Sequence, residues 1–158
     1  MDLRNDLAFS KLIAGSYARL VGSPLIPKEI SVADTARWLY QDARFCLVAH
    51  NRDPDPRFIY ANMSAQACFE YPWDEFLRLP SRLSAEEVSR EGRQRLLDAV
   101  TRDGVITNYC GVRITRSGRR FEIEDGTVWQ LIDTDGIPRG QAAMFQRPDA
   151  ARRTRVVG

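Results

Sequence analysis

Apolar residues recur at helical spacing over the first twenty residues of the chain. The pattern covers residues 3–20 and stops at Gly22 and Pro24, which predicts an amphipathic helix whose apolar face must dock on another element. After a turn-rich connector, Ser31 stands where an N-cap is expected, and a second short helix runs to about Tyr40. Both predicted helices precede any strand signal.

Two short apolar runs then predict a β-hairpin. Residues 45–49 and 58–60 are strand-like, and a long polar turn that contains proline separates them. Asn62 follows as the expected N-cap of a short helix, which Pro72 ends. Residues 73–77 predict one further helical turn.

The second half of the chain changes from helical to strand periodicity. Residues 84–87 (Ser-Ala-Glu-Glu) have the spacing of a capping box and predict a longer helix up to Gly104. From Val105 onward the apolar period is two, and Gly-containing turns divide the segment into a three-stranded antiparallel meander. The positions expected to face the core on its first two strands are Ile106, Cys110, Val112 and Ile114, followed by Phe121, Ile123, Trp129 and Leu131.

These elements predict one α+β domain. Five strands form a single antiparallel sheet, and the helices between the second and third strands must cover one face of it, because the alternating residues of the meander need burial. The expected divisions are an N-terminal helical extension over residues 1–44, the main domain over 45–146, and a basic flexible tail over 147–158.

The composition fits a self-sufficient domain. With 158 residues, 44% of them hydrophobic, the chain can bury roughly 70% of the surface that it exposes when unfolded. Its 23 basic and 21 acidic residues leave a net charge of +2, which gives no electrostatic reason to expect nucleic acid as a partner. The 3 cysteines are far apart and resemble free thiols of a reducing compartment. No stretch reads as a signal peptide or a membrane span, so a cytoplasmic protein is expected.

The order of elements resembles that of PAS domains, in which short helices wrap one face of a five-stranded antiparallel sheet and enclose a small cavity. More specifically, the chain resembles the MEKHLA-domain proteins, a PAS-related family. Several sequence blocks in the expected order, between residue 9 and about residue 146, carry this resemblance. They are Ser16-Tyr-Ala-Arg-Leu20 with Gly22-Ser-Pro-Leu25, Ala36-Arg-Trp-Leu-Tyr40, Tyr60-Ala-Asn62, Leu79-Pro-Ser-Arg-Leu-Ser84, and Tyr109-Cys-Gly-Val-Arg-Ile114 with Ser117-Gly-Arg-Arg-Phe121.

The resemblance implies a sensory or interaction role and no particular reaction. It leaves the cofactor undefined. PAS domains that bind haem carry a histidine on the long helix before the meander, and residues 84–103 contain none. Flavin-photosensing relatives carry a reactive cysteine in an Asn-Cys-Arg block, whereas the comparable stretch here, residues 79–84, has no cysteine. A covalent flavin adduct is therefore excluded, while non-covalent flavin stays open.

His50 is the only histidine, so any catalytic set must use it. Cys46 lies four residues upstream, roughly 13 Å along an extended strand, too far for a local Cys-His pair. One histidine and scattered cysteines also form no local metal signature. We therefore expect no catalytic residues and no metal site, with a structural histidine at the end of a strand.

The aromatic residues suggest where a ligand would bind. They come from both the helical cover and the sheet, and in a PAS-like layout they converge on a cavity with a few polar groups. The residues expected to line a ligand site are Tyr60, Asn62, Phe69, Tyr71, Trp73, Tyr109, Trp129 and Gln141. A core simply filled by these rings fits the same pattern.

The resulting hypothesis is a sensory or regulatory module without catalytic activity that binds a small ligand or a protein partner. One alternative is a pure interaction domain with a filled core, pairing as a homodimer through the first helix or a sheet face. The other alternative is a small enzyme that uses the cavity with His50 as its base.

Overall fold

The computed structural model of the protein describes residues 2–85 and 87–148, and of residues 87–90 and 93 it describes only the backbone. The basic tail predicted over 147–158 therefore lies outside the described residues from position 149 onward. The predicted boundaries of the domain stay predictions.

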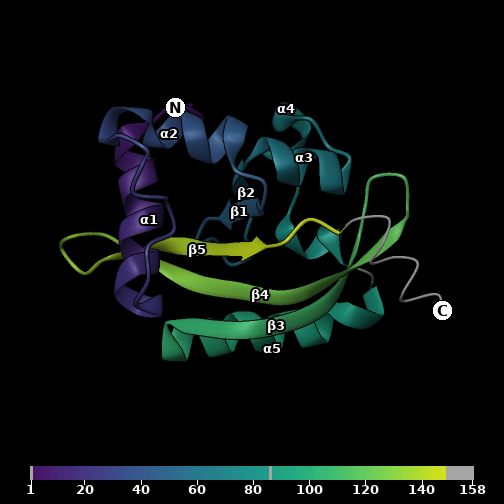
Figure 1. Cartoon of the computed structure of the whole chain (residues 1–158). Helices are drawn as coiled ribbons and strands as arrows, with labels where there is room; N and C mark the ends of the chain where they lie inside the picture. Colours follow the sequence, from purple (N-terminus) through teal and green to yellow (C-terminus); the bar gives the residue numbers. More distant parts are fainter. Residues whose placement is uncertain (1, 86, 149–158) are drawn as a thin grey trace.

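Five antiparallel strands form one sheet, in the spatial order β2-β1-β5-β4-β3. β1 and β2 pair as the predicted hairpin, and β3, β4 and β5 pair as the predicted meander, with β5 beside β1 in the centre (Figure 1). The strands are β1 (Cys46–His50), β2 (Phe58–Ala61), β3 (Val105–Ile114), β4 (Arg120–Ile132) and β5 (Pro138–Phe145). The predicted fold class is confirmed.

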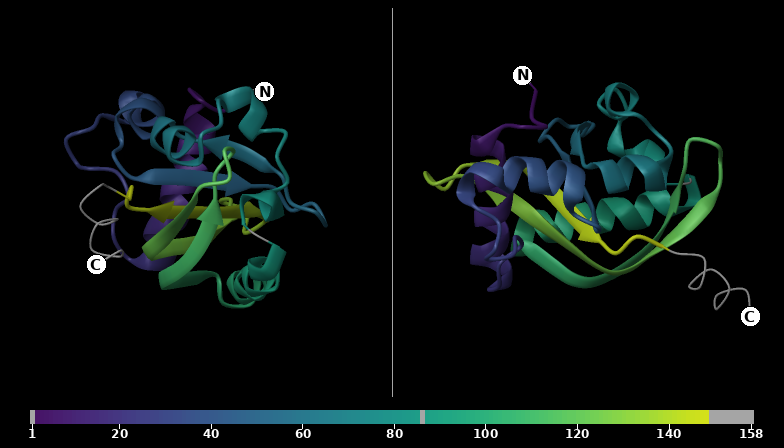
Figure 2. Two further views of the ribbon diagram at one scale, coloured as in Figure 1. Left: turned by 90° about the vertical axis from the view of Figure 1, so that its right-hand side faces the viewer. Right: turned by 45° about the horizontal axis from the view of Figure 1, so that its top comes forward.

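Short helices cover one face of this sheet, which we call the inner face. α3 packs on β1, α4 lies beside β2, and α5 packs on β3 and β4 (Figure 2). As predicted, Asn62 caps the first of these helices, because its side-chain oxygen accepts a hydrogen bond from the amide of Ala65 at 3.0 Å. The elements are α3 (Met63–Phe69), α4 (Trp73–Phe76), the short 3₁₀ helix η3 (Ser81–Ser84) and α5 (Glu87–Asp103).

The predicted capping box is wrong. Ser84 ends η3 instead of capping the long helix, and its hydroxyl donates to the carbonyl of Ser81 at 2.7 Å. α5 begins only at Glu87. The spacing of the motif is met, but Ala85 is extended, with φ of −127° and ψ of 152°, so no helix begins directly after Ser84.

The N-terminal helices lie on the opposite, outer face of the sheet. α1 begins after Asp6, whose carboxylate accepts from the amide of Phe9 at 2.8 Å, and ends at Gly22, which has a φ of 87°. The helix crosses β4, and the hydroxyl of Ser16 is hydrogen-bonded to both the carbonyl and the amide of Ile132, at 3.0 and 2.9 Å. The extension comprises α1 (Leu7–Val21), η1 (Val32–Asp34), α2 (Thr35–Arg37) and the π-helical turn η2 (Trp38–Asp42).

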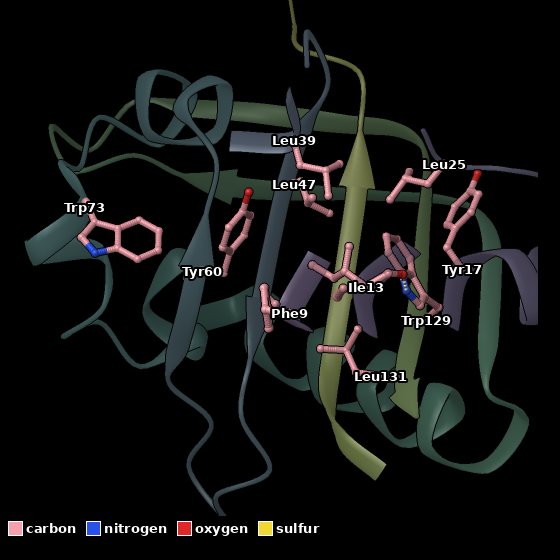
Figure 3. Packing of buried hydrophobic residues seen from close by; sticks show 12 residues of the cluster. Phe9, Ile13, Tyr17, Leu25, Leu39, Leu47, Tyr60, Trp73, Trp129 and Leu131 are labelled. Atoms are coloured by element: carbon pink, nitrogen blue, oxygen red, sulfur yellow. Dashed lines mark hydrogen bonds between the residues drawn. The ribbon is translucent and has the colours of Figure 1, made fainter. Parts of the chain in front are cut away.

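Each face of the sheet has its own hydrophobic cluster. The outer cluster, drawn in Figure 3, joins α1 to the sheet and includes Phe9, Ile13, Tyr17, Leu39, Leu47, Tyr60, Trp73, Trp129 and Leu131. The inner cluster joins α3 and α4 to the sheet and includes Cys46, Val48, Phe58, Ala65, Cys68, Phe69, Phe76, Ile123 and Phe145.

Bulges overturn the predicted inward face of the meander. On β3, Val112 is 38% exposed and Cys110 is exposed, whereas Arg113 is only 8% exposed. The pairing of β3 with β4 shifts register on both sides of Tyr109, next to Asn108, which has a φ of 55°. Since side chains alternate with a period of two, one extra residue exchanges the two faces for the rest of the strand.

The same reversal divides β4. Ile123 packs in the inner cluster, while Trp129 and Leu131 pack in the outer one. Asp125, with a φ of 53°, lies between them. The prediction that Phe121, Ile123, Trp129 and Leu131 share one face is therefore wrong.

Candidate functional site

A cavity of about 60 Å³ lies between the inner face of the sheet and the cover formed by η3 and α5. Most of its wall is apolar. Its polar lining comes from His50, Tyr109, Arg113, Thr127, Gln141 and the two serines of η3. A space of this size admits a small chemical group without rearrangement.

A second, polar cleft of about 210 Å³ opens beside the cavity. It lies between α5, the loop after β1, and the strands β4 and β5. His50, Leu97 and Gln141 line both spaces, so these residues form the boundary between the apolar cavity and the polar cleft.

Gln141, on β5, is the central polar group of this boundary. Its amide nitrogen donates to the carbonyl of Leu97 at 3.2 Å and to the hydroxyl oxygen of Thr101 at 3.0 Å. The Thr101 hydroxyl donates its own proton to the Leu97 carbonyl at 3.0 Å, which fixes the orientation of the Gln141 amide. Its carbonyl oxygen is buried and finds no hydrogen-bond partner among the residues that the structure describes. A buried acceptor of this kind requires an explanation, because it is costly to leave unpaired.

Arg113 and Tyr109, both on β3, form the second polar feature of the cavity wall. One terminal nitrogen of the guanidinium donates to the Tyr109 hydroxyl and the other to the Val112 carbonyl, both at 2.9 Å. The guanidinium carbon lies 5.5 Å from the centre of the Tyr109 ring. Gly111 makes this possible, because a Cβ there would overlap the Tyr109 hydroxyl.

His50 ends β1, and its Nδ1 lies 2.8 Å from the carbonyl oxygen of Asn51. That contact requires a proton on Nδ1. The thiol of Cys46 is engaged elsewhere: a hydrogen bond with Cys68 and burial raise its pKa above the ordinary range. In the part of the chain that the structure describes, no three His, Cys, Asp or Glu side chains come together as a metal site.

Three of the eight residues predicted to line a ligand site surround the cavity: Phe69, Tyr109 and Gln141. Tyr60 and Trp129 lie in the outer cluster instead. Burial raises the pKa of the Tyr60 hydroxyl well above its usual value. That these five residues contact a ligand stays a prediction.

The other three predicted residues lie around the helical cover. Trp73 belongs to the outer cluster and meets Tyr60 edge to face at 5.8 Å, near the β2 edge of the sheet (Figure 3). Tyr71 is half-buried against Phe76 at 5.7 Å. Asn62 is fully buried and makes four hydrogen bonds, which use the whole capacity of its amide.

Sequence reasoning missed Arg113 because the predicted strand phase placed it on the solvent side. The signal that could have found it is local. Asn108 tolerates a positive φ, and Gly111 within a strand indicates a bulge or a close approach.

The fold is that of PAS domains. The PAS domain of a protein from Colwellia psychrerythraea matches with a TM-score of 0.65 and 12% identity, over 75% of this chain and 98% of that one. An RNA-binding light-oxygen-voltage receptor matches with a TM-score of 0.64 and 18% identity, over 84% of this chain and 38% of that one. The dark-state light-oxygen-voltage domain of the photoreceptor Aureochrome1 matches with a TM-score of 0.56 and 17% identity, over 71% of this chain and 81% of that one. At these identities the likeness establishes the fold alone.

The sequence then identifies the particular family within this class. Residues 7–149 match the MEKHLA domain, so the chain belongs to the MEKHLA domain family. The predicted resemblance is confirmed. No curated protein sequence matches the chain. None of the helices over residues 2–85 and 87–148 is long and apolar enough to cross a membrane.

Proposed function

We propose that this protein is a sensory module without catalytic activity, which binds a small ligand in the inner cavity and reports the bound state to a protein partner. The observation that carries the proposal is the buried carbonyl oxygen of Gln141, which has no donor in the described chain. A ligand with an N–H or O–H group would supply that donor at the boundary between cavity and cleft.

The size of the site limits the class of ligand. Sites for drug-sized ligands usually enclose roughly 300 Å³ or more, whereas the cavity here encloses about 60 Å³ and the adjoining cleft about 210 Å³. One structural neighbour is a light-oxygen-voltage domain described with a flavin analogue. The small volume of the cavity and the absence of cysteine from η3 both support a ligand other than flavin. We therefore propose a ligand much smaller than flavin.

The outer face of the sheet suggests how the bound state reaches a partner. Trp129 of β4 donates its indole N–H to the carbonyl of Ile13 in α1 at 3.3 Å, while the neighbouring Val128 lines the cavity. A shift of this strand on ligand binding would therefore act directly on α1. We propose that the solvent-facing side of α1 is the surface that a partner, or a second copy of the chain, recognises.

A pair of isosteric probes tests the cavity. Pyrrole carries an N–H donor and thiophene does not, so pyrrole should perturb the NMR signals of residues around Gln141 at lower concentration than thiophene. Gln141→Leu should abolish this difference. Gln146→Leu, the same change at an exposed position after β5, should preserve it.

Two results would count against the proposal. If neither probe perturbs the cavity residues, the core is filled and the interaction-domain alternative is favoured. If pyrrole and thiophene bind equally to the wild type, the Gln141 carbonyl is not the recognition group.

A further inference from the structure

Arg113 is a buried cation without a counter-ion in the described chain. Its side chain lines the apolar cavity, and the residue is only 8% exposed. Arginines that form ion pairs elsewhere in the described chain are far more exposed. The side chain of Arg95, which pairs with Glu91, is 72% exposed. Among the residues whose side chains the structure describes, no carboxylate lies within ion-pairing distance of Arg113.

The surroundings of Arg113 compensate its charge only in part. Two of its five N–H groups are used, and both acceptors, the Val112 carbonyl and the Tyr109 hydroxyl, are neutral. The Tyr109 ring adds a cation–π contact, which is weaker than an ion pair with a carboxylate. Burying a charge without a partner of opposite sign is strongly unfavourable. The buried, unpaired guanidinium of Arg113 therefore points to an anion that binds it.

We propose that Arg113 binds the carboxylate of a small apolar monocarboxylic acid whose hydrocarbon part occupies the cavity. This inference rests on the proposed ligand-binding function and specifies the ligand. A planar guanidinium with free N–H groups matches a carboxylate in geometry and charge. The walls beyond Arg113 are apolar, with Phe58, Phe69, Ile123 and Phe145 among them. One guanidinium balances one negative charge, which favours a monocarboxylate over a phosphate dianion.

The first experiment compares carboxylate, amide and phosphate probes on the chain of residues 1–158 by calorimetry at neutral pH. Hexanoate should bind at least about tenfold more tightly than hexanamide, its neutral analogue, because a charge-assisted hydrogen bond replaces a neutral one. From propionate to hexanoate, affinity should rise by up to about fourfold per methylene while the chain enters the cavity. Inorganic phosphate should bind at least tenfold more weakly than hexanoate.

Variants then assign the effect to Arg113. Arg113→Met should reduce hexanoate affinity to that of hexanamide, and it should raise the melting temperature of the ligand-free protein because it removes an unpaired buried charge. Arg113→Lys should retain preference for hexanoate over hexanamide. Arg95→Met removes an exposed arginine and should change neither property.

The inference is overturned if hexanoate and hexanamide bind the wild type equally, or if Arg113→Met retains hexanoate binding. In the first case binding of both probes would still support the proposed ligand-binding function. If neither probe binds although pyrrole does, the carboxylate assignment fails alone. If no probe binds, both proposals fail. A lower melting temperature for ligand-free Arg113→Met would show that Arg113 stabilises the fold. It would then contradict the inference that its buried charge lacks a counter-ion in the ligand-free protein.

Discussion

The buried amide of Asn62 offers a sharp test of how the helical cover is attached to the sheet. Its oxygen accepts hydrogen bonds from the amides of Ala65 and Leu47, at 3.0 and 3.1 Å. Its nitrogen donates to the carbonyls of Leu39 and Phe45, at 3.1 and 2.9 Å. One side chain therefore joins α3, β1 and η2, and the residue is 0% exposed.

Asn62→Ala removes all four hydrogen bonds at once. Loss of the N-cap alone costs about 1 kcal/mol. Each backbone group left buried without a partner costs roughly 1 to 3 kcal/mol more. Because the chain relaxes in part around the smaller side chain, we expect a total loss of about 3 to 5 kcal/mol of unfolding free energy. Urea unfolding followed by circular dichroism measures this loss, with Asn5→Ala as the exposed control, for which we expect a change within about 0.5 kcal/mol.

Asn62→Asp separates the acceptor role from the donor role. Aspartate keeps the acceptor oxygen, but it replaces the donating nitrogen with a second, negatively charged oxygen that faces the carbonyls of Leu39 and Phe45. The pKa of this carboxyl should therefore rise above its ordinary value in the folded state. A raised folded pKa means that stability is lost as pH rises, so the variant should lie closer to the wild type at pH 4 than at pH 7. A loss below about 1 kcal/mol for Asn62→Ala would refute the reasoning, because it would mean that the network contributes little beyond an ordinary cap.

Two further predictions concern the attachment of α1 and of the β3–β4 turn. Trp129→Phe removes the indole N–H that bonds Ile13 and part of a fully buried ring, so it should cost about 1 to 3 kcal/mol and speed hydrogen exchange in α1, whereas Trp38→Phe should leave that exchange unchanged. Glu70 is ion-paired with Arg119 at 3.0 Å, and hydrogen bonds from the turn hold the pKa of its carboxyl below the ordinary 4.5. The stabilisation of the turn by the Glu70 carboxylate should be complete above pH 4.5 and should be lost as pH falls through the lowered pKa. Faster amide exchange in the turn at low pH would report this loss. Glu70→Gln should remove this pH dependence, and an unchanged pH profile in that variant would contradict the assignment.

The order of elements could be predicted because each is encoded by nearby residues. Helical spacing ending at Gly22 indicates α1, and Asn62 indicates the start of α3. The change to a period of two at Val105 indicates the meander. The family blocks add a long-range pattern that local signals lack, and together they were sufficient for the fold.

The composition of the cavity wall could not be predicted in the same way. Which side chains face inward depends on strand register, and one bulge reverses the phase for the remainder of a strand. Positive φ values at Asn108 and Asp125 mark such reversals, and they place Arg113 inside and Trp129 on the outer face. Neither reversal leaves a signal in hydrophobic periodicity, because each face of this sheet is covered by helices and both phases carry apolar residues.

The distribution of satisfied and unsatisfied polar groups distinguishes the ligand-binding proposal from a filled core. Asn62 and Ser16 are both fully buried, and their hydrogen bonds to the backbone are complete. Gln141 and Arg113 are nearly as buried, yet the first lacks a donor and the second lacks an anion in the described chain. Both of these groups line the same cavity. A core selected only for packing has no reason to collect its mismatched polar groups in one place, whereas a binding site must keep them available for its ligand.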